Sequence, residues 1–242
     1  MITLITYAPT FGQTAGSPFC VKAISLLTMS GLPWQREDTA DPRQMPKQKL
    51  PVIRDGGRLI ADSDNIRIHL EQKGADFDKG LSDMERATSR AFIRMAEENL
   101  YFHIVLDRWA NDTVWPVVRD TYFGAIPKPI RGFITGRLRK SVIRGADFQG
   151  LGRFSPEERI ARIEADLAAI TTRLWHGPFL FGDRPTAADA SVAAMLGAMR
   201  ATPGKTLLKM RVAEDEVLCR YIDRAEYAMG SAPIDATVKL CA

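Results

Sequence analysis

The sequence contains few of the residues from which disulfide frameworks and metal centres are built. Only three cysteines and three histidines occur in 242 residues, and the histidines lie far apart. Cys20, Cys219 and Cys241 are an odd number at wide spacings, so local spacing supports neither a disulfide framework nor a zinc cluster. We therefore expect reduced thiols and no bound metal, and the histidines form no catalytic set.

Long hydrophobic runs are also missing. No apolar stretch approaches the roughly 20 residues that cross a bilayer, so no transmembrane segment is predicted. The first basic residue is Lys22, so the N-terminus lacks the basic region of a secretory signal, and a cytoplasmic location is expected. The residues that are present, 45% hydrophobic and 26% charged, are typical of a globular chain and exclude disorder as the main state.

Acidic residues are absent from residues 121–146, where six basic residues occur. The formal net charge of +4 is therefore concentrated in a basic segment, residues 128–144, in which apolar residues are interspersed. Such a segment is typical of an anion-attracting lip beside an active site or of a membrane-surface contact, and the simpler alternative is a solvated cationic helix face. No DNA-binding motif accompanies it, so no nucleic-acid partner is expected. The six residues are Lys128, Arg131, Arg137, Arg139, Lys140 and Arg144.

The two parts of the chain have different hydrophobic periods. Up to about residue 75, short β-type runs alternate with turn signals, and the predicted order is β-α-β followed by β-β-α. From Ser82 onward the pattern is helical, and capping boxes open helices at Ser82, Ser155 and Thr186. The helix after Thr186 is rich in alanine, which predicts close packing at the centre of a bundle. We expect domains at residues 1–75 and 82–242. The strands are predicted at 2–8, 34–38, 50–54 and 58–61, and the first two helices at 18–29 and 63–73.

Three motifs together resemble a known family. They are Ser-Pro-Phe-Cys at residues 17–20, Lys-Leu-Pro-Val-Ile at 49–53 and Ala-Asp-Ser at 61–63. This combination resembles the glutathione S-transferase superfamily, and most closely its metaxin and failed-axon-connections branch. The resemblance implies an α/β thioredoxin-like N-terminal domain, an all-α C-terminal helical bundle, and glutathione as co-substrate.

Three residues are candidates for contact with the sulfur of glutathione. Because a helix N-terminus stabilises a thiolate, the resemblance to serine-type transferases assigns this role to Ser17, and the alternative is an ordinary helix cap. Cys20 occupies the second position of a Cys-Pro-Phe-Cys redox motif whose first position is Ser17, which excludes two-cysteine exchange. The remaining possibilities for Cys20 are a reaction that uses one thiol, or a structural role as a small buried side chain. Tyr7 lies near the position of the phenol in tyrosine-type transferases, with strand-end packing as its alternative.

The remaining candidates would hold the peptide part of glutathione. Leu50-Pro51 matches the family's cis-proline position, so the resemblance implies that Leu50, or Val52 in another register, binds the cysteinyl backbone. The alternative is a proline that starts an edge strand. Asp62 and Ser63 match the acidic-serine pair that holds the γ-glutamyl group, and the alternative is a helix cap alone. The neighbouring residue, at position 64, is a second acid that would weaken carboxylate binding unless it points away.

These observations support one leading hypothesis and two others. The leading hypothesis is a glutathione S-transferase-like enzyme that joins the thiolate of glutathione to a small electrophile held by the helical domain. The others are a non-catalytic metaxin-like interaction module and a monothiol redox protein that uses Cys20. The resemblance also implies a homodimer, in which acids of the region 76–85 could face the basic segment of the partner.

Overall fold

The computed structural model describes residues 1–232, so Cys241 lies outside the described residues. Its first part is a four-stranded sheet in the order β2-β1-β3-β4. Strand β1 (Ile2–Thr6) pairs in parallel with β2 (Trp34–Asp38) and antiparallel with β3 (Val52–Asp55). Strands β3 and β4 (Arg58–Ala61) form the predicted hairpin, whose turn residues Gly56 and Gly57 both have positive φ. Such values favour glycine because it lacks a Cβ atom.

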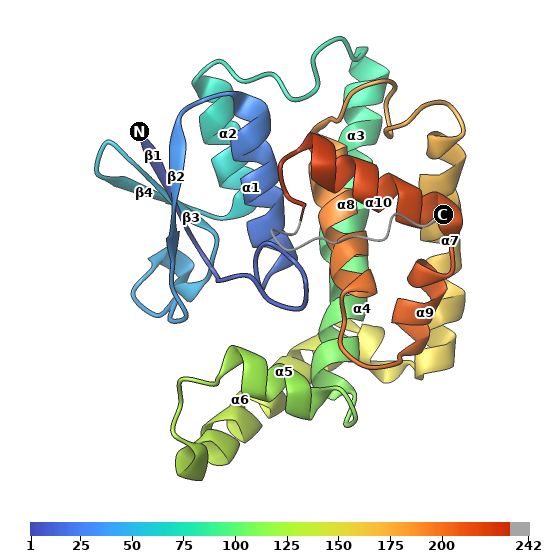
Figure 1. Cartoon of the computed structure of the whole chain (residues 1–242). Helices are drawn as coiled ribbons and strands as arrows, with labels where there is room; N and C mark the ends of the chain where they lie inside the picture. The colour runs from blue at the N-terminus through green and yellow to red at the C-terminus, as the bar shows by residue number, and fades with distance from the viewer. Residues whose placement is uncertain (233–242) are drawn as a thin grey trace.

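Helices α1 (Pro18–Ser30) and α2 (Ser63–Gln72) cover the same face of this sheet (Figure 1). Their inward residues, such as Leu26, Leu27, Ile66 and Leu70, are completely buried against the strands and each other. Between β2 and β3 the chain forms only a short 3₁₀ turn, η1 (Pro46–Gln48). The predicted thioredoxin-like α/β fold is confirmed. The first predicted strand ends at Thr6 and not at residue 8, and the third begins at Val52 and not at residue 50.

The rest of the described chain is helical. A long helix runs from Asp83 to Ala110 with two wider π-type turns, as α3 (Asp83–Met95), η2 (Ala96–Leu100), α4 (Tyr101–Val105) and η3 (Leu106–Ala110). The other helical elements are α5 (Trp115–Tyr122), α6 (Lys128–Gln149), η4 (Leu151–Arg153), α7 (Pro156–Leu174), α8 (Ala187–Arg200), α9 (Leu207–Ala213) and α10 (Glu216–Ala228). The predicted capping boxes are present at the starts of α3, α7 and α8.

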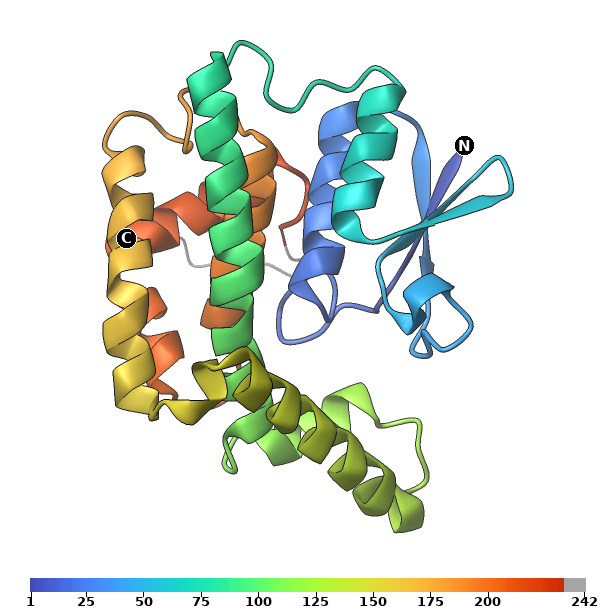
Figure 2. The ribbon, with the colours of Figure 1, turned by 180° about the vertical axis from the view of Figure 1, so that it is seen from behind.

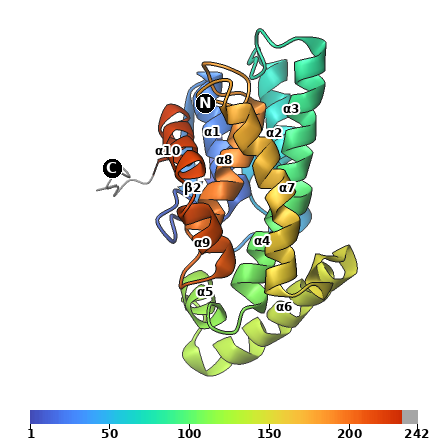
Figure 3. The same cartoon turned by 90° about the vertical axis from the view of Figure 1, so that its right-hand side faces the viewer.

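Helix α8 lies at the centre of the molecule, between α1 and the outer helices (Figures 1 and 3). Every residue from Ala187 to Met199 is buried, because small alanine side chains allow neighbouring helices to approach from several sides. A buried ion pair adds a polar contact at this junction: Lys22 of α1 donates to Glu97 of η2 at 2.5 Å, and the Ser191 hydroxyl donates to the same carboxylate at 2.8 Å. The sheet and the helical part therefore share one core.

Candidate functional site

The candidate residues meet at one end of the sheet. The last residues of β1 lie beside the start of β3, where Ile5 is opposite Val52, and Val52 is opposite Ala61 at the end of β4. The Asp62 amide donates to the Pro51 carbonyl at 3.3 Å, which joins the two peptide-binding candidates. The three sulfur candidates lie at the same end, because α1 begins beside the end of β1.

Ser17 stands at the N-cap position of α1, with Pro18 as the first helical residue. Its hydroxyl makes no capping hydrogen bond to the helix amides, whereas the hydroxyls of Ser82 and Ser155 do accept such bonds in α3 and α7. The interpretation of Ser17 as an ordinary cap is therefore not supported. Its half-buried hydroxyl lies at the positive end of a 13-residue helix, where a negatively charged sulfur is favoured.

Cys20 is completely buried one turn into α1. Burial raises the pKa of its thiol, and hydrogen bonding to Thr6, to the Tyr7 backbone and to Ser17 only opposes this rise. A thiol reacts as the thiolate, so a buried thiol of raised pKa is a poor nucleophile. The structure favours the interpretation of Cys20 as a small buried side chain.

Tyr7 is partly buried just beyond β1. Burial, with smaller effects from nearby Cys20 and Tyr101, raises its pKa to about 12. The phenol therefore stays protonated at neutral pH. It can donate a hydrogen bond, but its surroundings do not promote its ionisation.

A brace from the helical part holds the loop that precedes Ser17. The Tyr122 hydroxyl donates to the Gly16 carbonyl at 3.0 Å and accepts from Arg108 at 2.8 Å. Arg108 is itself buried and donates to the Ala198 carbonyl at 2.7 Å. Sequence analysis missed Arg108 and Tyr122, since their partners lie up to 106 positions away and no local spacing marks them.

Leu50 and Val52 differ in the availability of their backbone groups. The Leu50–Pro51 bond is cis, and neither the amide nor the carbonyl of Leu50 bonds to another described residue. Val52 instead pairs with β1 on one side and β4 on the other. Leu50 is therefore the better candidate for binding a peptide backbone. Strand β3 lies inside the sheet, so the alternative of a proline that starts an edge strand is wrong.

Asp62 and Ser63 lie at the start of α2. Asp62 is exposed and has a φ of 85°, and its Oδ1 accepts from the amides of Asp64 and Asn65 at 2.9 and 3.2 Å. Asp62 is thus a helix cap, and its Oδ2 bonds to no described residue. Ser63 is buried as the first residue of the helix. A capping role and a binding role are compatible for Asp62.

The second acid, Asp64, turns away toward basic side chains. It accepts from Arg67 at 3.1 Å and from Arg90 of α3 at 3.0 Å. Partial burial opposes its ionisation, but the charges of Lys22 and Arg67 outweigh this effect, and its pKa lies below the ordinary value. Its charge is therefore neutralised within the chain, which removes the expected obstacle to carboxylate binding.

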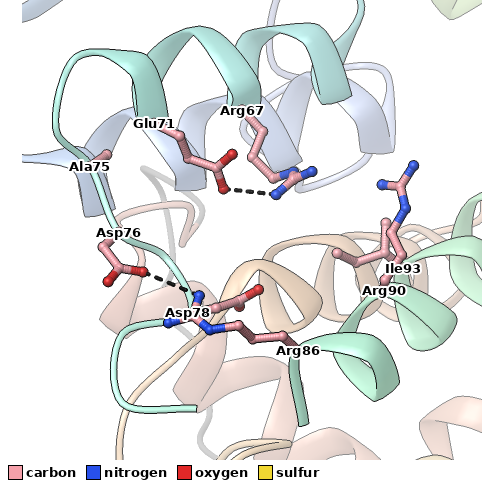
Figure 4. Close-up of a pocket in the computed structure, with 8 residues that line it drawn as sticks. All are labelled: Arg67, Glu71, Ala75, Asp76, Asp78, Arg86, Arg90 and Ile93. Carbon is pink, nitrogen blue, oxygen red and sulfur yellow. Dashed lines mark hydrogen bonds and ion pairs between the residues drawn. The ribbon is translucent and has the colours of Figure 1, made fainter. Parts of the chain in front are cut away.

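A cavity of about 480 Å³ lies between α2 and α3 (Figure 4), and two of its lining residues, Arg67 and Arg90, are the partners of Asp64. Its charges are balanced by ion pairs: Arg67 with Glu71 at 2.7 Å, and Arg86 with Asp76 at 3.7 Å. None of its lining residues belongs to the candidate site, so we assign it to the junction between the two parts. Within residues 1–232, no group of histidine, cysteine, aspartate and glutamate side chains could hold a metal ion.

Comparison with known proteins gives matches over most of the chain. The family model described as glutathione S-transferase N-terminal domain matches residues 18–114. The model described as glutathione S-transferase, C-terminal domain matches residues 157–224.

The chain resembles both a glutathione S-transferase and the metaxins. The chain is 32% identical over 235 residues to the isoprene-epoxide–glutathione S-transferase of Rhodococcus sp. (strain AD45), covering 93% of this chain and 97% of that protein. It is 28% identical over 175 residues to metaxin-1 of Mus musculus, covering 69% of this chain but only 55% of that protein. Among solved structures, the β-etherase LigF from Sphingobium sp. strain SYK-6 has a TM-score of 0.62 at 16% identity, with 93% and 94% of the two chains covered.

Proposed function

Because the chain belongs to the glutathione S-transferase superfamily, we propose that it binds glutathione at the end of the sheet described above and transfers it to a small electrophile. The γ-glutamyl group would lie at Asp62 and Ser63, and the cysteinyl backbone would bond to the free amide and carbonyl of Leu50. The sulfur would then lie at Ser17. The cytoplasm remains the location we propose.

The chemistry follows from the position of Ser17. Its hydroxyl, which does not cap α1, donates to the sulfur and with the helix N-terminus favours the thiolate over the thiol. The thiolate attacks a carbon of the electrophile, so that an S–C bond forms and the bond to the leaving atom breaks with its electron pair. The name of the 32% identical relative suggests an epoxide as the first test substrate, in which a ring C–O bond breaks and the oxygen takes up a proton. The uncapped Ser17 hydroxyl is the observation that carries this proposal.

Substitution of Ser17 tests the sulfur contact. Ser17→Ala should lower turnover about 100-fold, as removal of one donor to a developing anion does, and change glutathione affinity by less than about threefold. It should also raise the pKa of the bound glutathione thiol, measured by thiolate absorbance. Ser82→Ala removes a hydroxyl that only caps α3 and should leave activity unchanged. Loss of activity in Cys20→Ala or Tyr7→Phe, with Ser17→Ala near normal, would refute the assignment.

Substitution of Asp62 separates its two roles. Asparagine caps helices as well as aspartate does, so Asp62→Asn should leave the unfolding temperature nearly unchanged while it removes the charge that meets the γ-glutamyl amino group. We expect a loss of about ten- to hundredfold in glutathione affinity by calorimetry. If the wild type binds no glutathione at millimolar concentration, the transferase proposal fails.

If the wild type binds no glutathione, a second function is favoured. The 28% identity to metaxin-1 supports a protein that uses this fold as an interaction module without catalysis. Monothiol chemistry through Cys20 receives no such support, because the thiol is completely buried. Binding of glutathione without turnover of any electrophile would also favour the interaction module.

Family membership further leads us to propose a homodimer. The suggested attraction between the acids of region 76–85 and the basic segment is weakened by the structure. Asp76 pairs with Arg86 of the same chain, and Glu85 completes the capping box of Ser82. Light scattering at micromolar concentration should show a dimer whose formation does not depend on the basic segment, and a monomer would contradict this proposal.

A further inference from the structure

Helix α6 projects from the body of the helical part (Figures 1 and 2). It carries several large apolar side chains that are exposed. Ile130, Phe133, Ile134 and Leu138 are 50%, 66%, 43% and 41% exposed. At 100° per residue these four lie within about 140° of the helix circumference, so they form one surface, here named the α6 face. Clustered exposed apolar side chains usually mark an interaction site.

The six cations of the basic segment divide into two groups. Arg139 donates to the Trp109 carbonyl at 2.6 Å, and Arg131 donates to the Gly124 carbonyl at 2.8 Å, so these two attach α6 and its preceding loop to the body. The other four make no ion pair with any carboxylate of residues 1–232. They are Lys128, Arg137, Lys140 and Arg144.

Two of these free cations lie next to the α6 face. Arg137 stacks on the Phe133 ring at 4.6 Å, and the positions of Arg137 and Arg144 fall within the arc of the exposed apolar residues. Long basic side chains can lie along an apolar surface while their charged ends reach outward. The α6 face is thus an apolar strip accompanied by positive charge. The one acid of α6, Asp147, makes no ion pair with a cation of residues 1–232.

We propose that α6 binds peripherally to the surface of an anionic lipid bilayer. The apolar residues of the α6 face enter the boundary between headgroups and acyl chains, and the free cations within or beside that face, Arg137, Lys140 and Arg144, meet lipid phosphates. The helix lies on the membrane and does not span it, in keeping with the absence of any membrane-spanning helix from the described part of the chain.

The charge pattern favours this partner over two others. A second copy that met the same face about a two-fold axis would bring Arg137, Lys140 and Arg144 of both copies together, and α6 offers a single acid, Asp147, to offset them. A nucleic acid would attract the cations but would leave Phe133 and Ile134 exposed to water. An anionic bilayer satisfies both the charges and the apolar side chains.

Co-sedimentation of the full chain with lipid vesicles tests the proposal. The wild type should pellet with phosphatidylcholine vesicles that contain phosphatidylglycerol and stay in solution with phosphatidylcholine alone. Binding should weaken when salt is raised from about 50 to about 500 mM, because salt screens surface charges. Pelleting that is absent with the anionic vesicles, or equal with both kinds, would overturn the proposal.

Two sets of substitutions locate the contact. Arg137→Gln, Lys140→Gln and Arg144→Gln combined should weaken partitioning about 100-fold, at about fivefold per cation. Phe133→Ser with Ile134→Ser should weaken it at least about tenfold. Because all five side chains lie on the surface or at its margin, circular dichroism should show native helicity in each variant, and unchanged vesicle binding by either would refute the contact.

Matched controls change the same chemistry elsewhere on the surface. Arg58→Gln, Lys79→Gln and Lys205→Gln combined remove three exposed cations outside α6, and Tyr227→Ser removes a side chain that is 83% exposed. Both controls should bind as the wild type does, and a loss equal to that of the α6 variants would indicate unspecific adsorption and refute the assignment. If light scattering shows an assembly that Phe133→Ser with Ile134→Ser breaks up, a second copy covers the face and the proposal is wrong.

Discussion

Glu226 of α10 is a buried acid whose ionisation should weaken the fold near neutral pH. Glu226 is 2% exposed, and burial raises the pKa of its carboxyl from the ordinary 4.5 to about 7. Gln13, in the loop before Ser17, donates to its Oε1 at 3.3 Å, and Arg200 lies 3.5 Å from its Oε2. Arg200 also pairs with Asp223 at 2.7 Å, so it keeps a partner when the charge of Glu226 is removed.

The direction and size of the effect follow from the two pKa values. The folded protein holds the proton of Glu226 more tightly than the unfolded chain does. The stability that this bound proton contributes is therefore complete below about pH 4.5. This contribution is lost as the pH rises through about 7. One pKa unit corresponds to about 1.4 kcal/mol, so ionisation should cost the fold roughly 3 kcal/mol.

Urea unfolding of the wild type and of Glu226→Gln at pH 5, 6, 7 and 8 measures this cost. The difference in unfolding free energy between the two should change by roughly 2.5 kcal/mol over this range, with the variant gaining at high pH. Other buried acids act equally on both proteins and cancel in the difference. Glu214→Gln, an exposed acid without an ion pair, is the control and should follow the wild type. Equal pH dependence of the wild type and Glu226→Gln would refute the reasoning.

Two further substitutions test the contacts between the sheet and the helical part. Glu97→Gln leaves the Lys22 ammonium buried without its counter-charge and should lower the unfolding free energy by about 3 to 5 kcal/mol. Lys22→Met combined with Glu97→Gln should recover part of this loss. A loss below about 1 kcal/mol in Glu97→Gln would contradict the importance of the ion pair. Tyr122→Phe removes the donor to the Gly16 carbonyl and should lower the unfolding free energy by about 1 kcal/mol. It should also lower turnover more than it lowers glutathione affinity. Unchanged kinetics would show that the hydrogen bond from Tyr122 does not position Ser17.

The sequence alone predicted the elements and the motifs, because these depend on a few neighbouring residues. Proline after Ser17, the glycines between β3 and β4, and the capping boxes of α3, α7 and α8 act over three or four positions, and each of these elements is present. The three family motifs are equally local, and they were sufficient to identify the superfamily. Element ends were less well predicted, since pairing with β1 decides where β3 begins.

Only the tertiary structure decided which groups are available for chemistry. Whether Ser17 caps its own helix, whether Cys20 is accessible and whether the backbone of Leu50 is paired all depend on contacts that local spacing does not describe. The brace from Tyr122 to Gly16 spans 106 positions, and the bond from Gln13 to Glu226 spans 213. Burial and hydrogen-bond partners are properties of the packed chain, because residues distant in sequence supply them.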